Sequence, residues 1–144
     1  MRHLKPFAVL LAVVAVCAAM RGQDPWREQV RRQLIADAAK MAEYDLTLSH
    51  DIMFGDLNSG YQSSFSVQLR GGSTYFIIGE CDGDCSDLDL KLYRGDGELL
   101  NQDVDDDDHP VIRITPRETR TFRIQPIMAS CAHNPCSWGV GIFR

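Results

Sequence analysis

The sequence predicts an all-β fold, an antiparallel β-sandwich of about seven to eight strands, preceded by one amphipathic α-helix. Three observations support this expectation. Short segments of alternating apolar and polar residues follow one another from residue 61, turn residues separate them, and helical periodicity is confined to residues 24–43. Seven short strands at this spacing are typical of a sandwich. The length of 144 residues is that of one domain.

The first segment resembles a secretory signal peptide. A short basic start, Met1–Lys5, precedes an uncharged apolar run, Pro6–Ala19, that ends in small residues. The run is shorter than the ~20 apolar residues that span a bilayer. We expect residues 1–19 to be removed after Ala19; a retained membrane anchor, or lipidation of Cys17, is the alternative. The mature chain is then expected outside the cytoplasm, in the periplasm or secreted, with no transmembrane segment.

Residues 20–56 are expected to form an N-terminal helix and a linker. Asp24 suits the N-cap of the helix, and Pro25 suits its first position. One apolar stripe recurs at spacings of four and three: Trp26, Val30, Leu34, Ala38 and Met41. The stripe predicts a helix docked on the domain or acting as a stalk. The alternative is a helix that binds a partner or a membrane surface.

The β-sandwich is expected over residues 57–144. Tyr61, Phe65, Val67 and Leu69 alternate with polar residues, and residues 75–78 are continuously apolar, as in a buried strand. Turn signals separate the segments, for example Gly95–Gly97 and Asn134–Pro135. The expected strands cover residues 61–69, 75–78, 88–92, 98–104, 111–115, 120–127 and 137–143.

Four cysteines remain if the signal peptide is removed: Cys81, Cys85, Cys131 and Cys136. An even number of cysteines in an oxidising compartment predicts two disulfides. Pairing of Cys81 with Cys85 and of Cys131 with Cys136 would close one loop each. A cross-link between the two loops stays open, as does a zinc site that includes His133, although C-x3-C and C-x4-C are unusual spacings for zinc.

The turn at Gly95–Gly97 sets the register of a hairpin. A two-residue turn would place Leu90 opposite Asp103, whereas a three-residue turn with Gly97 in the left-handed region pairs Arg94 with Glu98. We expect the second register, because it places Leu92 opposite Leu100 and Leu88 opposite Val104 on one apolar face. Its other face then pairs Asp89 with Asp103 and Asp87 with Asp105.

This register predicts a calcium site at one end of the sandwich. Residues 80–109 hold twelve of the twenty acidic residues and only two basic ones. Carboxylates that face each other repel, and Ca²⁺ binds six to eight oxygen ligands. The sequence does not match an EF-hand loop, and a solvated acidic loop is the alternative. The candidate ligands are Asp82, Asp84, Asp87, Asp89, Asp103 and Asp105.

Other residues point less clearly to a function. The net charge of −5 argues against a nucleic-acid binder, which needs a basic face. His50, His109 and His133 lie in separate loops, and no G-x-S-x-G, H-E-x-x-H or Walker motif is present in the sequence. We therefore expect a protein that is not an enzyme. A basic strip beside the acidic end is an open alternative, formed by Arg113, Arg117, Arg120 and Arg123.

Residues 60–143 resemble the bacterial pre-peptidase C-terminal domain. The similarity lies in YFIIG at 75–79, DLDLKLY at 87–93, GDG at 95–97, Leu99, Thr115–Pro116 and TFRI at 121–124. The resemblance implies a jelly-roll-like β-sandwich attached to secreted enzymes, often proteases, and not itself catalytic. Some members bind calcium through acidic residues, and some bind polymers such as collagen. The two cysteine pairs resemble instead those of small bacterial secreted proteins with this architecture.

The expected function is that of a secreted or periplasmic non-catalytic binding or accessory module, stabilised by Ca²⁺ at its acidic end. Its partner is expected to be an extracytoplasmic protein or polymer of unknown identity, not a nucleic acid. The alternative is a periplasmic enzyme inhibitor or an envelope chaperone that acts through the helix or the disulfide loops. A small hydrolase is a third, more distant class.

Overall fold

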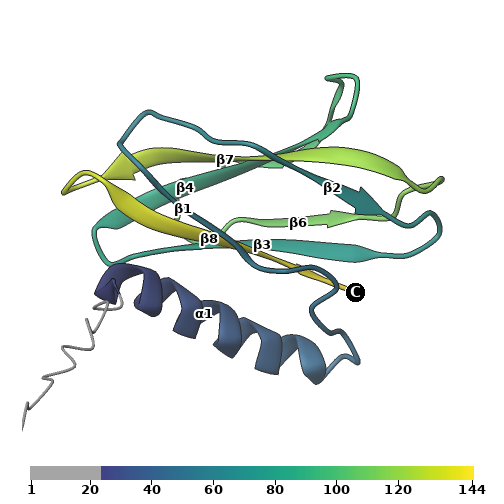
Figure 1. Ribbon diagram of the computed structural model, residues 1–144, viewed down its shortest axis with the longest axis horizontal. Coiled ribbons are helices and arrows are strands. Elements are labelled where there is room, and N and C mark those ends of the chain that lie inside the picture. Colours follow the sequence, from purple (N-terminus) through teal and green to yellow (C-terminus); the bar gives the residue numbers. More distant parts are fainter. Residues whose placement is uncertain (1–23) are drawn as a thin grey trace, which may run out of the picture.

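The computed structural model describes residues 24–144, so the predicted signal peptide lies outside the described residues. Two four-stranded antiparallel sheets form a sandwich, and one helix packs against the outer face of one of them, which confirms the all-β sandwich (Figure 1). The strand order is β1-β8-β3-β6 in one sheet and β2-β7-β4-β5 in the other. The elements are α1 (Pro25–Ala42), β1 (Met53–Leu57), β2 (Phe65–Leu69), β3 (Tyr75–Cys81), β4 (Cys85–Arg94), β5 (Leu99–Asp103), β6 (Val111–Ile114), β7 (Arg120–Cys131) and β8 (Cys136–Phe143).

The core lies between the two sheets and is filled from every second position of the central strands. Leu88, Leu90 and Leu92 of β4 are fully buried, whereas Asp89 and Lys91 between them are only partly buried. Trp138 and Val140 of β8 face the same core from the opposite sheet. Alternation along each strand is what a sandwich requires, because one face of each sheet packs inward.

Helix α1 lies along the outer face of the sheet that contains β8 and β3 (Figure 1). Asp24 caps the helix by accepting a hydrogen bond from the Trp26 backbone N–H at 3.1 Å. Val30 and Leu34 are fully buried beneath it. A Cβ atom on Gly139 would lie 2.8 Å from Val30 Cγ1 and 2.9 Å from Leu34 Cδ1, so only glycine lets the helix approach this closely. The helix therefore belongs to the packed domain.

Strand β1 is the element that the sequence pattern misses, and it starts before the boundary expected at residue 57. It pairs with β8 from Met53↔Val140 to Leu57↔Cys136. Its sequence, MFGDL, lacks clean alternation because Gly55 lies in the middle. A Cβ atom there would lie 2.6 Å from Cζ2 of Trp138. Gly55 thus interrupts the alternating pattern, and only glycine fits there because the Trp138 ring lies opposite it in the β1–β8 ladder.

The register predicted for the β4–β5 hairpin is wrong beyond its turn. The turn itself has the expected form, with Gly97 at φ 102° and the Arg94 N–H donating to the Glu98 carbonyl at 2.8 Å. The register then shifts between Leu92 and Tyr93, so that Tyr93 pairs with Leu99 but Leu90 pairs with Asp103. The extra residue is a β-bulge at Leu100. It removes the expected Leu92–Leu100, Leu88–Val104, Asp89–Asp103 and Asp87–Asp105 pairs.

Edge position explains why burial did not fix that register. Among residues 24–144, strand β5 pairs only with β4 and forms an edge of its sheet. Leu100 still packs against the core, whereas Val104 remains 45% exposed. The bulge orients Leu100 toward the core and leaves Val104 in solvent. At a sheet edge this exposure lowers the stability little, and bulges are common there.

Within the described part of the chain, no helix is both long enough and apolar enough to cross a membrane.

Candidate functional site

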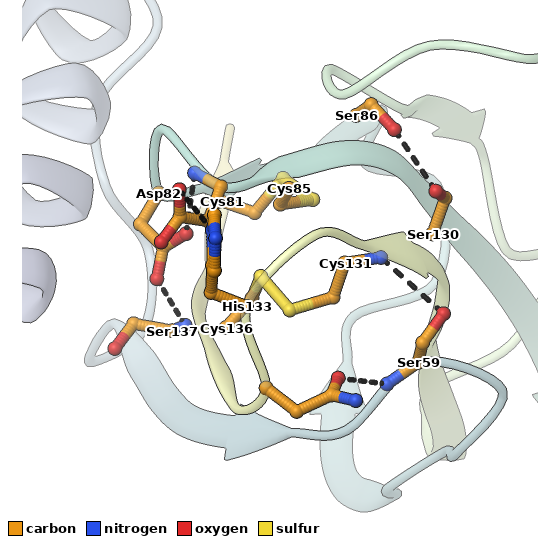
Figure 2. Close-up of a disulfide and its surroundings, with 12 residues drawn as sticks. Ser59, Cys81, Asp82, Cys85, Ser86, Ser130, Cys131, His133, Cys136 and Ser137 are labelled. Atoms are coloured by element: carbon orange, nitrogen blue, oxygen red, sulfur yellow. Dashed lines mark hydrogen bonds and ion pairs between the residues drawn. A yellow bond between two sulfur atoms is a disulfide. The ribbon is translucent and has the colours of Figure 1, made fainter.

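The two disulfides pin neighbouring loops at one end of the sandwich (Figure 2). Cys81 bonds to Cys85 and Cys131 bonds to Cys136, as the local pairing predicts, and no bond links the two loops. The loops adjoin each other because Cys85 and Cys131 are paired across the β4–β7 ladder. Two disulfides are typical of proteins that fold in an oxidising compartment outside the cytoplasm.

Asp82 and Asp84 lie at this disulfide end and are occupied by structural contacts. Asp82 is only 3% exposed, and its carboxylate accepts hydrogen bonds from the Ser137 N–H at 2.5 Å and the Asp84 N–H at 3.1 Å (Figure 2). Asp84 lies 3.2 Å from His133 Nδ1. Charged acceptors of backbone N–H groups stabilise a loop strongly. Asp82 therefore ties the β3–β4 loop to β8.

The other predicted calcium ligands lie along the acidic rim, which comprises Asp87, Asp89, Asp103 and residues 105–108. Asp103 accepts hydrogen bonds from the Val111 and Asp105 N–H groups at 2.8 and 3.3 Å. Burial raises the pKa of Asp87, and the neighbouring Asp89, Asp106 and Asp107 raise it further. Burial also raises the pKa of Asp89; Lys91 opposes this rise and Asp103 adds to it.

The six predicted ligands are thus divided between two places. Asp82 and Asp84 belong to the disulfide end, whereas Asp87, Asp89 and Asp103 belong to the rim, with Asp105 exposed in the loop beyond it. The expected neighbour of Asp87 is Asp105, but the carboxylates that raise its pKa include Asp106 and Asp107, which are not among the six predicted ligands. Calcium binding remains a prediction.

A different group of side chains comes together under the helix. The structure brings Asp37 of α1, Glu80 of β3 and His109 of the β5–β6 loop so close that one ligand atom from each lies within 4.8 Å of the others. We call these residues the Asp37–Glu80–His109 cluster. It is the one group of three or more potential metal-ligating side chains at this spacing in residues 24–144.

The cluster is largely buried and closely hydrogen-bonded. Asp37 and Glu80 are 3% and 8% exposed. His109 Nδ1 lies 2.6 Å from Glu80 Oε1, and Lys40 Nζ lies 3.4 Å from Asp37 Oδ1. Asp37 Oδ2 is buried and has no hydrogen-bond partner among the described residues. Buried polar atoms are rarely left unpaired in proteins.

Electrostatics at the cluster follow from this geometry. Burial raises the pKa of Glu80, the bond to His109 opposes the rise, and the nearby Asp37 adds to it. The hydrogen bond to Glu80 raises the pKa of His109, while burial lowers it. Carboxyl groups this close favour a shared proton or a bound cation.

The sequence contains a weak signal for this cluster. Asp37 follows Val30 by seven positions and Leu34 by three, so it lies on the buried face of the helix. The buried face of the helix includes Asp37, whereas Trp26, which belongs to the expected apolar stripe, is 46% exposed. Glu80 ends a nearly continuous apolar run in β3. A carboxylate at a buried position in each of two elements is the pattern that reveals such a pair.

A groove lies at the opposite end of the sandwich from the disulfides. Its volume is about 330 Å³, and it combines apolar side chains with a rim of arginines. Arg94 and Arg120 form ion pairs with Glu98 and Glu118, both at 2.8 Å. The lining includes Leu100, Ile114, Pro116, Phe122, Arg117 and Arg120.

The four arginines of the expected basic strip do not lie together. Only Arg117 and Arg120 line the groove. Arg123 stacks over the Tyr93 ring at 4.1 Å, and Arg113 lies 6.0 Å from the centre of the Phe76 ring. The arginines therefore contribute to separate surfaces.

The three candidate histidines, His50, His109 and His133, are also separate. His50 accepts or donates at Nδ1 toward Ser49 Oγ at 2.9 Å, and its Nε2 lies 3.0 Å from the Gln68 carbonyl. Because a carbonyl only accepts, Nε2 carries a proton. A shallow pocket of about 280 Å³ adjoins this pair. His133 lies at the disulfide end, and His109 belongs to the buried cluster.

Comparison with known proteins adds no family to this description. No family model matches the chain, and a search of curated proteins finds no match.

Proposed function

We propose that the protein acts outside the cytoplasm as a non-catalytic binding or accessory module, and that it binds its partner in the arginine-rimmed groove. The observation that carries this proposal is the groove's composition. Leu100, Ile114 and Phe122 offer apolar contacts, while the exposed Arg117 stands at the rim without an ion-pair partner among residues 24–144. Binding sites typically combine an apolar lining with a few polar groups that fix orientation.

The chemistry of the groove favours an acidic and apolar ligand. Three arginines and Glu118 line it, so its local charge is positive in a chain of net charge −5. Arginine binds carboxylates through two parallel hydrogen bonds. We therefore propose an extended segment of an extracytoplasmic protein or polymer in which a carboxylate adjoins an apolar group. The resemblance to the pre-peptidase C-terminal domain supports a binding role, because it implies a non-catalytic domain and some members of that family bind polymers.

The test is a selection of random peptides on the immobilised protein, followed by affinity measurements. Twelve-residue peptides displayed on phage are selected at physiological salt, and enriched sequences are synthesised and measured by fluorescence anisotropy. We expect enriched peptides to share an acidic residue next to apolar ones. Arg117→Glu should weaken their binding about tenfold, which corresponds to about 1.4 kcal/mol.

The matched control is Arg32→Glu, which changes the net charge equally. Arg32 is exposed on helix α1 and does not line the groove. Its substitution should leave peptide affinity unchanged. Enrichment without a common pattern, or equal losses in both variants, would refute the groove as the binding surface.

The alternative functions have weaker support. An inhibitor or chaperone that acts through the helix would need its apolar face, but Val30 and Leu34 are buried against the sheet. A hydrolase would need an activated nucleophile, for which the described residues offer the Ser49–His50 pair. Ser49 Oγ also lies 3.1 Å from the Ile142 carbonyl, which competes for its proton. Labelling of Ser49 by a fluorophosphonate, lost in Ser49→Ala, would favour the hydrolase over the binding module.

Calcium stabilisation is the second part of the proposal. Asp87 Oδ1 is buried and has no partner among the described residues, and several carboxylates surround it. We expect Ca²⁺ to raise the melting temperature and EDTA to lower it. Asp87→Asn and Asp89→Asn should weaken this response. A melting temperature that stays flat across a calcium titration, in the wild type and in both variants, would exclude the site.

A further inference from the structure

We propose that the Asp37–Glu80–His109 cluster is a binding site for one divalent transition-metal ion, for which Zn²⁺ is the best-fitting common choice. The site shares no residue with the groove and lies between helix α1 and the outer face of the sheet that contains β3. Its ligands come from α1, from β3 and from the β5–β6 loop, three segments that are distant in the sequence.

The spacing of the ligand atoms suits an ion after small side-chain movements. The three atoms lie within 4.8 Å of one another, and Zn²⁺ bonded at 2.0–2.2 Å places its ligands roughly 3.3–3.6 Å apart. His109 Nδ1 and Glu80 Oε1, now 2.6 Å apart, would have to separate slightly. His109 can move because its side chain is 42% exposed on a loop.

A second observation, independent of the spacing, also points to a ligand. Asp37 is 97% buried, yet its Oδ2 has no hydrogen-bond partner among the described residues. Lys40 reaches only Oδ1, at 3.4 Å, and its side chain is 70% exposed. A buried carboxylate oxygen without a donor is unfavourable, and a cation placed between Asp37 and Glu80 would satisfy it.

The donor set selects the kind of ion. Calcium and magnesium prefer oxygen ligands alone and bind more of them. One imidazole nitrogen and two carboxylates suit Zn²⁺ and its neighbours in the first transition row. The four cysteines of the described chain are all in disulfides, so thiolates do not compete for the metal. Three protein ligands would leave one tetrahedral position for a water molecule.

The test uses the tag-free protein with both disulfides formed. Calorimetric titration with Zn²⁺ should show one equivalent bound, and Co²⁺ should give the visible absorption of a nitrogen–oxygen site. His109→Ala and Glu80→Gln should weaken Zn²⁺ binding at least a hundredfold. The matched control is His133→Ala, because His133 also lies beside a carboxylate but outside the cluster. The His133→Ala variant should bind Zn²⁺ as tightly as the wild type.

Two results would overturn the proposal. One is the absence of saturable one-equivalent binding of either ion to the wild-type protein. The other is a His109→Ala variant that binds Zn²⁺ as tightly as the wild type. In either case a proton shared between Asp37 and Glu80 explains the cluster instead. If Glu80→Gln fails to fold, the Co²⁺ spectrum of the wild type and the His109→Ala titration still decide the question, because His109 lies on a partly exposed loop.

Discussion

Truncation of Leu34 to alanine measures how firmly helix α1 is held on the sandwich. Leu34 is fully buried, and its methyl groups fill the space above the two glycines of β8. A Cβ atom on Gly139 or Gly141 would lie 2.9 or 3.4 Å from them. The truncation removes three buried carbons and leaves a cavity that neither glycine can fill.

The expected loss of stability is about 3–4 kcal/mol. Three carbons contribute about 2.4 kcal/mol of transfer free energy at ~0.8 kcal/mol each. The remaining cavity adds to this cost, as in other leucine truncations, which range over about 2–5 kcal/mol. For a domain of this size, each kcal/mol shifts the melting temperature by about 3–5 °C. The melting temperature should therefore fall by about 9–20 °C.

Thermal and urea unfolding followed by circular dichroism measure this loss. The control is Ile35→Ala, since Ile35 is the next residue of the same helix and is 57% exposed. Its substitution should change stability by less than about 0.5 kcal/mol. If Leu34→Ala costs under about 1 kcal/mol and matches the control, the helix does not contribute to the cooperative fold and the packing argument is wrong.

Three further predictions concern the disulfide end and the acidic rim. Asp82→Ala should cost about 2–3 kcal/mol in urea unfolding, because it leaves the Ser137 N–H buried without its charged acceptor; a loss below about 0.5 kcal/mol would contradict this role. Reduction of both disulfides should destabilise the protein by about 2 kcal/mol per bond, as their short loops predict, and unchanged stability in excess reductant would disagree. The pKa of Asp87 is raised in the folded protein above its ordinary value of 3.8, so its ionisation disfavours folding. In the absence of calcium, the wild type should therefore lose stability relative to Asp87→Asn as the pH rises from the unfolded pKa of Asp87 through its folded pKa. Melting temperatures of both proteins between about pH 3 and 7 measure this loss. An equal pH dependence of the two melting temperatures would refute the prediction.

Most of the fold could be predicted because alternation and turn residues are local signals. Each of the seven expected strand segments overlaps a strand, and the helix expected within residues 24–43 is observed at Pro25–Ala42 with Asp24 as its cap. The pairing of cysteines also follows local spacing. Strand β1 could not be predicted, because Gly55 is set by a distant ring, that of Trp138.

The rule that burial selects the register gives a wrong prediction for the β4–β5 hairpin, because β5 is an edge strand. Burial does select register where both strands are covered. Strand β5 is covered on one side only, so a bulge at Leu100 is tolerated and Val104 stays exposed. Sequence patterns do not tell an edge strand from a central one here.

The candidate site was the least predictable part. Runs of aspartate are conspicuous in a sequence, but the structure divides the six candidate ligands between the β3–β4 loop and the acidic rim. Asp37 and Glu80 are single acids within apolar patterns, and they meet only because the helix packs across β3. Such encounters depend on tertiary packing rather than on spacing along the chain.

The sandwich is unevenly constrained along the direction of its strands. In the β4–β7 ladder, Cys85 and Cys131 pair at one end, and Arg94 and Phe122 pair at the other. Loops closed by disulfides hold the first end, whereas the second end, where the groove lies, is held by core packing, hydrogen bonds and exposed ion pairs without a disulfide. Rigidity should therefore decline from the cysteines toward the groove. The groove end can adjust its shape to a ligand while the opposite end preserves the frame.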